Sequence, residues 1–205
     1  MWFLLYLEDM HLFFSTPVWI KQLNNFENIN DELKSYIYQA RKDNPEGVKK
    51  SNVNGWHSEG LDLKNQSLKN FITEISNNIG SAIKDMNWDL DSQIARITNM
   101  WAIINKERAF NERHHHGNSS LSAAYYVKAE KNAGDLIFFD PRQANVFHHP
   151  TSKEANSLNC QVQSVTPRAG TLVLFPSYLE HKVAENLSNE ERIVVSFNVS
   201  LIKKN

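Results

Sequence analysis

The sequence is short of several features that would point to particular classes of protein. It contains one cysteine, Cys160, among 205 residues, so no disulfide can form within the chain, and this fits a reducing compartment. Its formal net charge is only −1, with 22 Lys and Arg against 23 Asp and Glu. A balance this even gives no electrostatic reason to expect a nucleic acid or an anionic membrane surface as a partner.

No apolar run is long enough to cross a bilayer. Met1 to Leu7 is apolar, but a membrane-spanning helix needs about 20 such residues. The segment also lacks the basic start and the small-residue cleavage site of a signal peptide. Met10 offers a second start, and we expect residues 1–9 to be an uninformative extension.

Two helices are expected in the first half of the chain. From Asn28 to Lys42, apolar residues recur three and four positions apart, with Asn30 or Asp31 as the candidate N-cap. A clearer apolar stripe at helical spacing runs from Leu68 to Met86. The segment between them, Asn44 to Gly60, is rich in Asn, Gly and Ser and predicts a loop.

After Met86, short runs rich in β-branched and aromatic residues alternate with turn residues. This spacing favours an antiparallel sandwich or barrel over alternating strands and helices. A long loop, Pro141 to Asn159, interrupts the series, and loops of this length are often functional. The predicted strands are Ala95–Asn105, Leu121–Lys128, Asp135–Phe139, Gln161–Val165, Thr171–Phe175 and Arg192–Leu201.

The last predicted strand has two unlike faces. Burying an unpaired Arg or Asn costs several kcal/mol, so a polar face turned inward needs partners, and an anionic ligand would suit Arg192. The alternative is that this face is exposed to solvent, and the strand alone leaves both open. One face carries Ile193, Val195, Phe197, Val199 and Leu201, and the other carries Arg192, Val194, Ser196, Asn198 and Ser200.

Three adjacent histidines precede the strand that begins at Leu121. Residues i and i+2 of an extended segment point the same way, so His114 and His116 can bind one metal ion together. His181 follows a later strand, at the start of a further expected strand, and would supply a third ligand. A facial set of this kind leaves open positions for a cosubstrate and O₂.

Plainer interpretations of these histidines compete with the metal site. The triplet can be a solvated loop, and His181 can be a buried structural residue. Arg192 favours the metal site, because it lies eleven residues after His181 on the polar face described above. A guanidinium there can pair with a carboxylate that chelates the same ion through its other end.

Five segments in order resemble one known family. Asn111–Val127 resembles N-x-x-H-x-H-x-x-S-x-L-S-x-x-Y-Y-V, Phe138–Arg142 resembles F-x-D-P-R, and Pro167–Ser177 resembles P-x-x-G-x-L-x-L-F-P-S. His181 and Arg192–Asn198 complete the series. The family is that of 2-oxoglutarate–Fe(II) oxygenases from bacteria and their viruses, and the resemblance extends over nearly the whole chain from Met10.

The resemblance implies a fold and a role for each of the site residues. The fold would be mainly β with N-terminal helices, a double-stranded β-helix or jelly-roll barrel. Residues 10–205 would form a single domain, with a helical part at 10–94 packed on a barrel core at 95–201. His114 and His181 would bind iron, and Arg192 would bind the distal carboxylate of 2-oxoglutarate. Tyr126 would bond the same carboxylate, and the remaining lining residues of the cosubstrate pocket would be Asn105, Ser196 and Asn198.

The sequence departs from the related prolyl hydroxylases at one position. Those enzymes carry H-x-D, whereas here His116 stands where the carboxylate would be. A three-histidine iron site carries about one more positive charge, which would strengthen binding of the 2-oxoglutarate dianion. Asp140 is the alternative source of a carboxylate ligand, and we favour His116.

The implied activity is that of an Fe(II)- and 2-oxoglutarate-dependent dioxygenase. It would be a hydroxylase that couples oxidative decarboxylation of 2-oxoglutarate to C–H oxidation by O₂. Kinship with prolyl hydroxylases makes a peptidyl or free amino acid a candidate substrate, by analogy alone. We expect no nucleic acid and no membrane as partners, a homodimer as one option, and a cytoplasmic location, in the host cell if the chain is viral.

Two other classes of function stay open. A cupin-type oxygenase would use three histidines and iron without 2-oxoglutarate, and would not need Arg192 to face the metal. A non-catalytic jelly-roll binding module would have lost ligands that are all present here. Trp56, His57 and Trp101 either line a substrate pocket or belong to the core, and His148 and His149 are expected to be loop or substrate-side residues.

Overall fold

The computed structural model describes residues 12–143 and 150–204, so that the extension 1–9 and both His148 and His149 lie outside the described residues. The described residues form two helices and eleven strands. They are β1 (Trp19–Gln22), α1 (Phe26–Asp43), β2 (Asn52–Val53), β3 (Trp56–His57), α2 (Gln66–Asp85), β4 (Gln93–Asn105), β5 (Phe110–His114), β6 (Leu121–Lys128), β7 (Leu136–Phe139), β8 (Val162–Val165), β9 (Thr171–Pro176), β10 (His181–Val183) and β11 (Arg192–Lys203).

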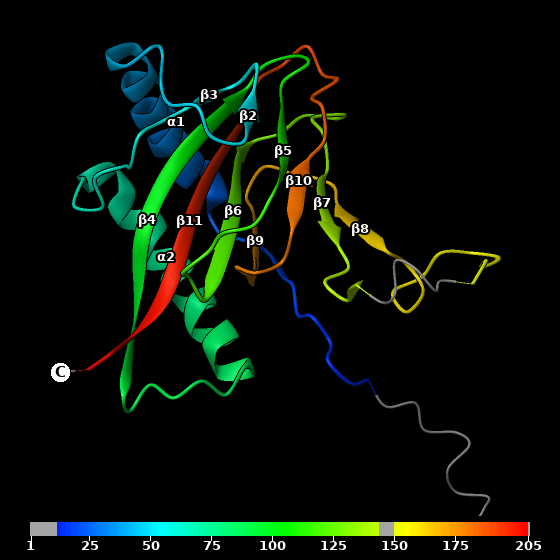
Figure 1. Ribbon diagram of the computed structural model, residues 1–205. Helices are drawn as coiled ribbons and strands as arrows, with labels where there is room; N and C mark the ends of the chain where they lie inside the picture. Colours follow the sequence, from blue (N-terminus) through cyan, green and yellow to red (C-terminus); the bar gives the residue numbers. More distant parts are fainter. Residues whose placement is uncertain (1–11, 144–149, 205) are drawn as a thin grey trace, which may run out of the picture.

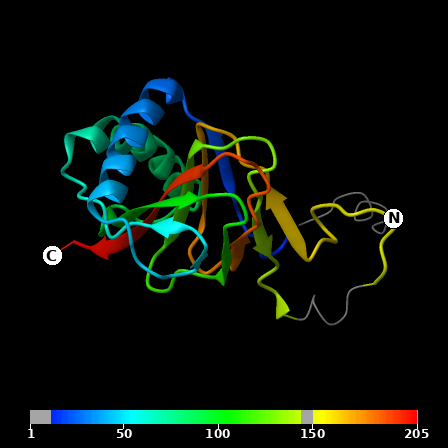
Figure 2. The same cartoon turned by 90° about the horizontal axis from the view of Figure 1, so that it is seen from above.

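The strands form two antiparallel sheets that face each other. The six-stranded sheet has the order β1-β9-β6-β11-β4-β3, and the five-stranded sheet has the order β2-β5-β10-β7-β8. Helices α1 and α2 lie against the outer side of the six-stranded sheet, and the five-stranded sheet lies on its other side (Figures 1 and 2). The predicted class, mainly β with N-terminal helices, is confirmed, in the form of two separate sheets and not one closed barrel.

Strand β11 is the centre of the six-stranded sheet, where it pairs with β4 on one side and β6 on the other. Its apolar face belongs to the core beneath the helices. On the opposite face Arg192, Ser196 and Asn198 are only 1%, 8% and 6% exposed. The alternative of a solvent-exposed polar face is therefore wrong, and these side chains point between the two sheets.

Both helices form where the apolar spacing predicts them, and they bury one stripe against the sheet. In α2 this stripe includes Phe71, whose ring centroid lies 4.7 Å from that of Tyr125 and 6.3 Å from that of Phe197. The remaining buried members of the stripe are Leu68, Ile75, Ile79, Ala82 and Ile83.

The predicted N-cap of α1 is wrong. The helix begins earlier, with Asn25 as its cap residue, at φ 50° and without a side-chain capping bond. Asn30 lies inside the helix and is buried, where its Oδ1 accepts a hydrogen bond of 2.7 Å from the Tyr125 hydroxyl. A polar residue on the buried stripe is thus explained by a partner on the sheet, which helix spacing alone does not reveal.

Four short strands were missed by the sequence patterns: β1, β2, β3 and β5. The strands β2 and β3 fall in the segment Asn44–Gly60, which was expected to be a loop. They have only two residues each, too few for a visible alternation, and exist through pairing with β5 and β4. Their place in the fold is set by partners distant in sequence.

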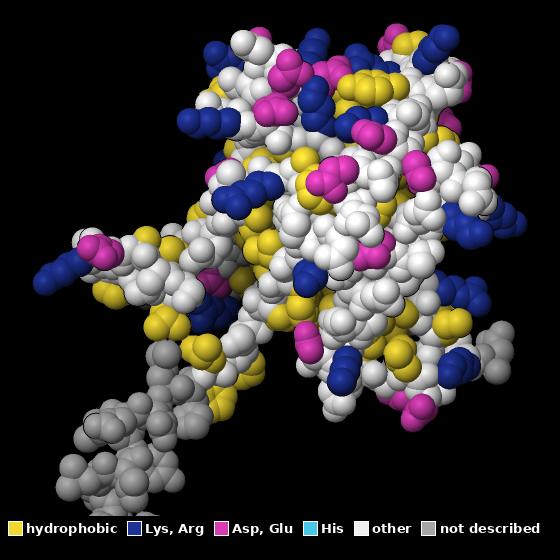
Figure 3. Space-filling view, turned by 180° about the vertical axis from the view of Figure 1, so that it is seen from behind, with side chains coloured by type: hydrophobic (Ala, Val, Ile, Leu, Met, Phe, Trp, Pro, Cys, Tyr) yellow, Lys and Arg dark blue, Asp and Glu magenta, His cyan; other side chains and the backbone are white. Residues whose placement is uncertain are grey.

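No helix in the described part of the chain is long and apolar enough to span a membrane. On the face shown in Figure 3, Lys and Arg side chains are interspersed with Asp and Glu. This mixed surface agrees with the balanced composition.

We predict that Phe71→Ala lowers the free energy of unfolding by about 3–5 kcal/mol, because it removes a fully buried ring from the contact between α2 and the sheet. Urea unfolding followed by circular dichroism measures the loss. The neighbouring change Ile72→Ala, at a partly buried position, is the control and should cost clearly less. Equal losses from the two would contradict this account of the core.

Candidate metal and ligand-binding site

Three histidines converge between the sheets. His114 ends β5, His116 follows two residues later, and His181 begins β10, where it is the cross-strand partner of His114. One candidate ligand nitrogen from each of the three lies within 4.8 Å of the other two. In the described residues this cluster contains histidines alone, and no carboxylate.

Backbone carbonyls fix the protonation of two of these rings. The Nδ1 atom of His114 lies 2.7 Å from the carbonyl oxygen of Glu112, and that of His181 lies 2.9 Å from the carbonyl oxygen of Leu179. A carbonyl oxygen only accepts, so each Nδ1 carries the proton. The Nε2 lone pairs of both rings are then free to bind a metal ion.

The cluster favours neutral imidazoles. Burial lowers the pKa of His116 to about 4 and that of His181 to about 3, and the neighbouring His114 acts in the same direction on both. Burial also lowers the pKa of His114. Neutral imidazole is the form that binds metal ions, so the set can accept a cation at neutral pH without first losing protons.

Asp140 is not part of this cluster. Arg142 donates to its carboxylate from the backbone N, Nε and Nη2, at 2.9, 3.0 and 2.8 Å. Its side chain lines a separate hollow together with Phe139 and Arg142. Of the two candidates for the third ligand position, His116 is the one that the fold brings to His114 and His181.

A cavity of about 670 Å³ lies between the sheets and contains the three histidines. Two groups of residues from sequence analysis meet in it, the histidines of the five-stranded side and the polar face of β11. The predicted residues that line it are His114, His116, His181, Tyr126, Arg192, Ser196 and Asn198.

Arg192 is a buried cation without an anion. Its Nη1 donates to the carbonyl oxygens of Ala133 and Gly134, at 2.7 and 3.1 Å, while its Nε has no partner. No carboxylate in the described residues forms an ion pair with it. Burial lowers its pKa to about 10, so the guanidinium stays charged at neutral pH. A buried charge of this kind is costly unless an anion is bound beside it.

Tyr126 lies on β6, next to β11, and faces the same cavity. Burial raises its pKa to about 12, and the charge of Arg192 opposes this rise. Neither its hydroxyl nor that of Ser196 bonds to another group in the described residues. Both hydroxyls are thus free to meet a ligand that reaches Arg192.

The turn that holds Arg192 was missed by sequence reasoning. Gly134 has φ +89°, and a Cβ added there would lie 2.2 Å from the carbonyl oxygen of Ala184. Only glycine fits this close approach of two chain segments. The sequence shows a turn here, but not that its two carbonyl groups face a guanidinium 58 residues later.

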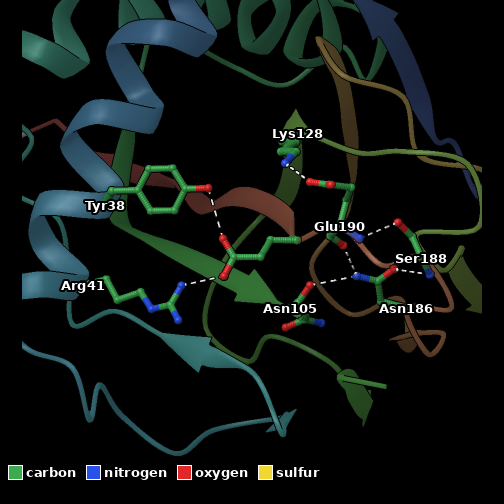
Figure 4. Close-up of polar contacts among 8 residues, drawn as sticks. Tyr38, Arg41, Asn105, Lys128, Asn186, Ser188 and Glu190 are labelled. Atoms are coloured by element: carbon green, nitrogen blue, oxygen red, sulfur yellow. Dashed lines mark hydrogen bonds and ion pairs between the residues drawn. The ribbon is translucent and has the colours of Figure 1, made fainter. Parts of the chain in front are cut away.

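The loop before β11 is clamped by its own polar groups (Figure 4). Asn186 Nδ2 donates to the carbonyl oxygens of Asn105 and Glu190, and its Oδ1 accepts from the backbone N of Ser188. At the end of the same loop, Glu191 binds Arg41 of α1 at 2.7 Å. These bonds determine where β11 starts, and hence where Arg192 sits.

Asn105 does not line the cavity. Its side chain is fully buried and donates through Nδ2 to Asn111 Oδ1 at 3.0 Å, while its own Oδ1 has no partner. Asn111, one layer closer, does line the cavity. Any effect of Asn105 on a bound ligand is therefore indirect.

Strand alternation separates the aromatic residues that the sequence left undecided. Trp56 belongs to the core beneath the helices, and its Nε1 donates to the carbonyl oxygen of Asn44. His57 and Trp101 instead line the cavity. Trp101 stacks with both His57 and His116, with centroid distances of 5.9 and 5.5 Å.

Residues 99–198 match the model of the family described as "Putative 2OG-Fe(II) oxygenase". This region contains all three histidines, Tyr126 and Arg192. A comparison with curated proteins finds no match to the sequence.

Solved structures resemble the whole fold at low sequence identity. A prolyl-4-hydroxylase from Pseudomonas putida aligns with a TM-score of 0.63 and 13% identity, over 93% of this chain and 95% of its own. HygX from Streptomyces hygroscopicus, solved with nickel, 2-oxoglutarate and hygromycin B bound, aligns at 0.60 and 12%, over 91% and 83%. A viral collagen prolyl hydroxylase from Paramecium bursaria Chlorella virus-1 aligns at 0.51 and 12%, over 89% and 94%. These likenesses show the jelly-roll fold.

We predict that the metal-free protein loses stability as the pH falls. In the unfolded chain the histidines titrate near pH 6.5, whereas burial holds the pKa values of His116 and His181 at about 4 and 3. Between these values the unfolded state binds more protons, so acid favours it, by up to about 1.4 kcal/mol per pH unit for each ring. Urea unfolding between pH 7 and about pH 4 measures the slope. His181→Gln should flatten it, and an unchanged slope would contradict the burial of neutral rings.

Proposed function

We propose that the chain belongs to the 2OG-Fe(II) oxygenase family, whose model matches its residues 99–198, and that it is a hydroxylase that uses iron(II), 2-oxoglutarate and O₂. We also propose that residues 10–205 act as one domain. The observation that carries the proposal is Arg192, a buried and unpaired cation that faces the same cavity as three neutral histidines.

The residues present fit both groups. His114, His116 and His181 would hold the iron, since neutral imidazole is a ligand that suits iron(II) and their ligand atoms lie within 4.8 Å of one another. Arg192 would receive the distal carboxylate of 2-oxoglutarate, which would give its unpaired Nε an acceptor. Tyr126 and Ser196 would add hydroxyl donors on the same side.

The protein's part in the reaction is to bind, to orient and to exclude water. When bound, the iron and 2-oxoglutarate would supply the oxidising power that splits O₂ and hydroxylates a C–H bond. Arg192, which is only 1% exposed, would fix one end of the cosubstrate within the cavity. The apolar side chains of Leu136, Phe175 and Val194 would keep that end dry.

A set of three histidine ligands would affect the net charge of the metal site. Three neutral ligands leave the full double charge of the ion uncompensated, and Arg192 adds another positive charge nearby. The only acidic residue among the cavity's lining residues is Glu59, near the loop after β3. A dianion such as 2-oxoglutarate is therefore a suitable occupant, because it offsets charge that the protein itself leaves unbalanced.

The substrate would enter near Lys50, His57 and Glu59, which line the cavity. Lys50 and Glu59 are both exposed and neither forms an ion pair in the described residues. An amino acid, free or within a peptide, remains our candidate substrate. HygX, a structural neighbour, was solved with hygromycin B, so the shared fold does not select a substrate by itself.

Anaerobic addition of 2-oxoglutarate to the Fe(II)-loaded protein tests the proposal. We expect a metal-to-ligand charge-transfer band in the visible region, since the keto acid would chelate the iron. Stoichiometric iron binding without this band would favour the cupin-type alternative. An absence of stoichiometric iron binding would favour the non-catalytic module.

We predict that Arg192→Met weakens 2-oxoglutarate binding by at least about 30-fold, because losing one partner of a buried charge pair costs about 2–5 kcal/mol. Isothermal titration of the Co(II)-loaded protein measures this. Without ligand, the same variant should unfold at an equal or higher temperature, since it removes an unpaired buried charge. Arg113→Met, which removes an exposed arginine paired with Glu180, is the control and should leave both quantities unchanged.

A further inference from the structure

The three histidines are not held in the same way. His114 and His181 each donate from Nδ1 to a backbone carbonyl two residues earlier in the chain, which fixes the ring plane and the free nitrogen. His116 has no such bond to the backbone in the described residues, and its ring is hydrogen-bonded by the Asn198 side chain instead. It lies beyond the end of β5, where β5 no longer pairs with β10. The third imidazole is therefore oriented by side chains and not by the backbone.

Trp101 supplies a surface against this ring. Its indole lies 5.5 Å from the His116 imidazole between centroids, with an interplanar angle of 20°. This distance falls in the usual range for offset-stacked aromatic rings. His116 also stacks with His181, at 5.2 Å and 22°, so the ring has two aromatic neighbours, the indole and a second histidine.

The Trp101 indole also stacks on His57, a ring that is held by the backbone. His57 stacks on Trp101 at 5.9 Å and 8°, and its Nδ1 lies 2.6 Å from the carbonyl oxygen of Ser58. Ser58 in turn binds Ala102, the residue after Trp101, through two bonds: its backbone N donates to the Ala102 carbonyl oxygen, and its Oγ accepts from the Ala102 N, both at 2.9 Å. The stack is thus anchored where β3 meets β4.

The strand register explains why a large side chain fits here. Ser196 on β11 lies directly across from Trp101, and Ala124 on β6 lies across from Ser196. Both are small and belong to the same inner face, so the indole has room above the sheet. The same alternation that sends Trp56 into the helix-side core turns Trp101 toward the histidines.

We propose that Trp101 is a positioning residue of the metal site, which holds the His116 imidazole in the orientation that lets it share one ion with His114 and His181. The inference rests on the proposed function, since it assumes that the histidine cluster binds a metal. Trp101 acts through His116 and does not itself touch the ion. Together with the Asn198 side chain, it would orient His116 as the backbone carbonyl groups orient the other two histidines.

Co(II) affinity of the full-length protein tests this role. We expect Trp101→Ala to weaken Co(II) binding by about 10-fold or more, the usual cost of losing a group that orients a metal ligand. Trp101→Phe, which retains a ring for stacking, should recover most of the affinity. Trp19→Ala is the matched control, because Trp19 lies on β1 and bonds to Asp85 on α2, away from the cavity, and it should bind Co(II) as the wild type does.

A double-mutant cycle separates positioning from general packing. In a His116→Ala background, Trp101→Ala should cause no further loss of Co(II) affinity, because the ring that it orients is already absent. An additional loss of similar size in that background would overturn the proposal. Thermal unfolding of each metal-free variant checks that it is folded, and Trp101→Leu, which keeps apolar bulk without an aromatic ring, replaces the alanine variant if that one is unfolded.

The outcomes distinguish this inference from the proposed function. If the wild-type protein binds no Co(II), the metal site itself is refuted, and the role of Trp101 falls with it. If the wild type binds Co(II) and the Trp101 variants bind it equally well, only the positioning role is refuted. Wild-type tryptophan fluorescence should also fall when Co(II) binds, and Trp101→Phe should lose much of that change.

Discussion

The burial of one guanidinium constrains much of this structure. Arg192 sits at the start of the central strand, is 1% exposed, and within the described residues has two carbonyl oxygens as its hydrogen-bond partners. To hold it there, a tight turn at Gly134 must approach Ala184 closely, and the loop around Asn186 must end at a defined point. An unpaired buried cation is energetically unfavourable, and a fold that contains one without binding an anion would be unusual. We therefore interpret the cavity as a ligand-binding site.

Strand alternation distributes the chemistry between the two sides of the six-stranded sheet. On β11, odd-numbered apolar residues pack under the helices, while Arg192 and the residues at every second position after it face the cavity. Strands β3 and β4 follow the same rule, so that Trp56 faces the helices and Trp101 faces the histidines. The helices thus stabilise the sheet from one side and leave the other side free for polar groups.

The candidate metal-binding histidines come from the side of the opposite sheet, and their rings are held in different ways. His114 and His181 are cross-strand partners whose rings are locked by carbonyl groups, whereas His116 depends on aromatic neighbours and on the Asn198 side chain. Since the cluster contains no carboxylate from the described part of the chain, the charge of a bound ion would be balanced by its other ligands. Arg192 and three neutral imidazoles then favour the same kind of occupant, a small dianion.

The sequence by itself determined the features that depend on local periodicity. The helical stripes, the bounds of β6 at Leu121–Lys128, the two faces of β11 and the i, i+2 pair His114 and His116 all follow from side-chain spacing. The tertiary structure alone decided which distant groups meet. The two-residue strands β2 and β3, the N-cap of α1, the carbonyl groups that face Arg192, the choice of His116 over Asp140 in the cluster and the stacking of Trp101 all depend on strand register. Register is set by pairing between segments far apart in the chain, and no local pattern records it.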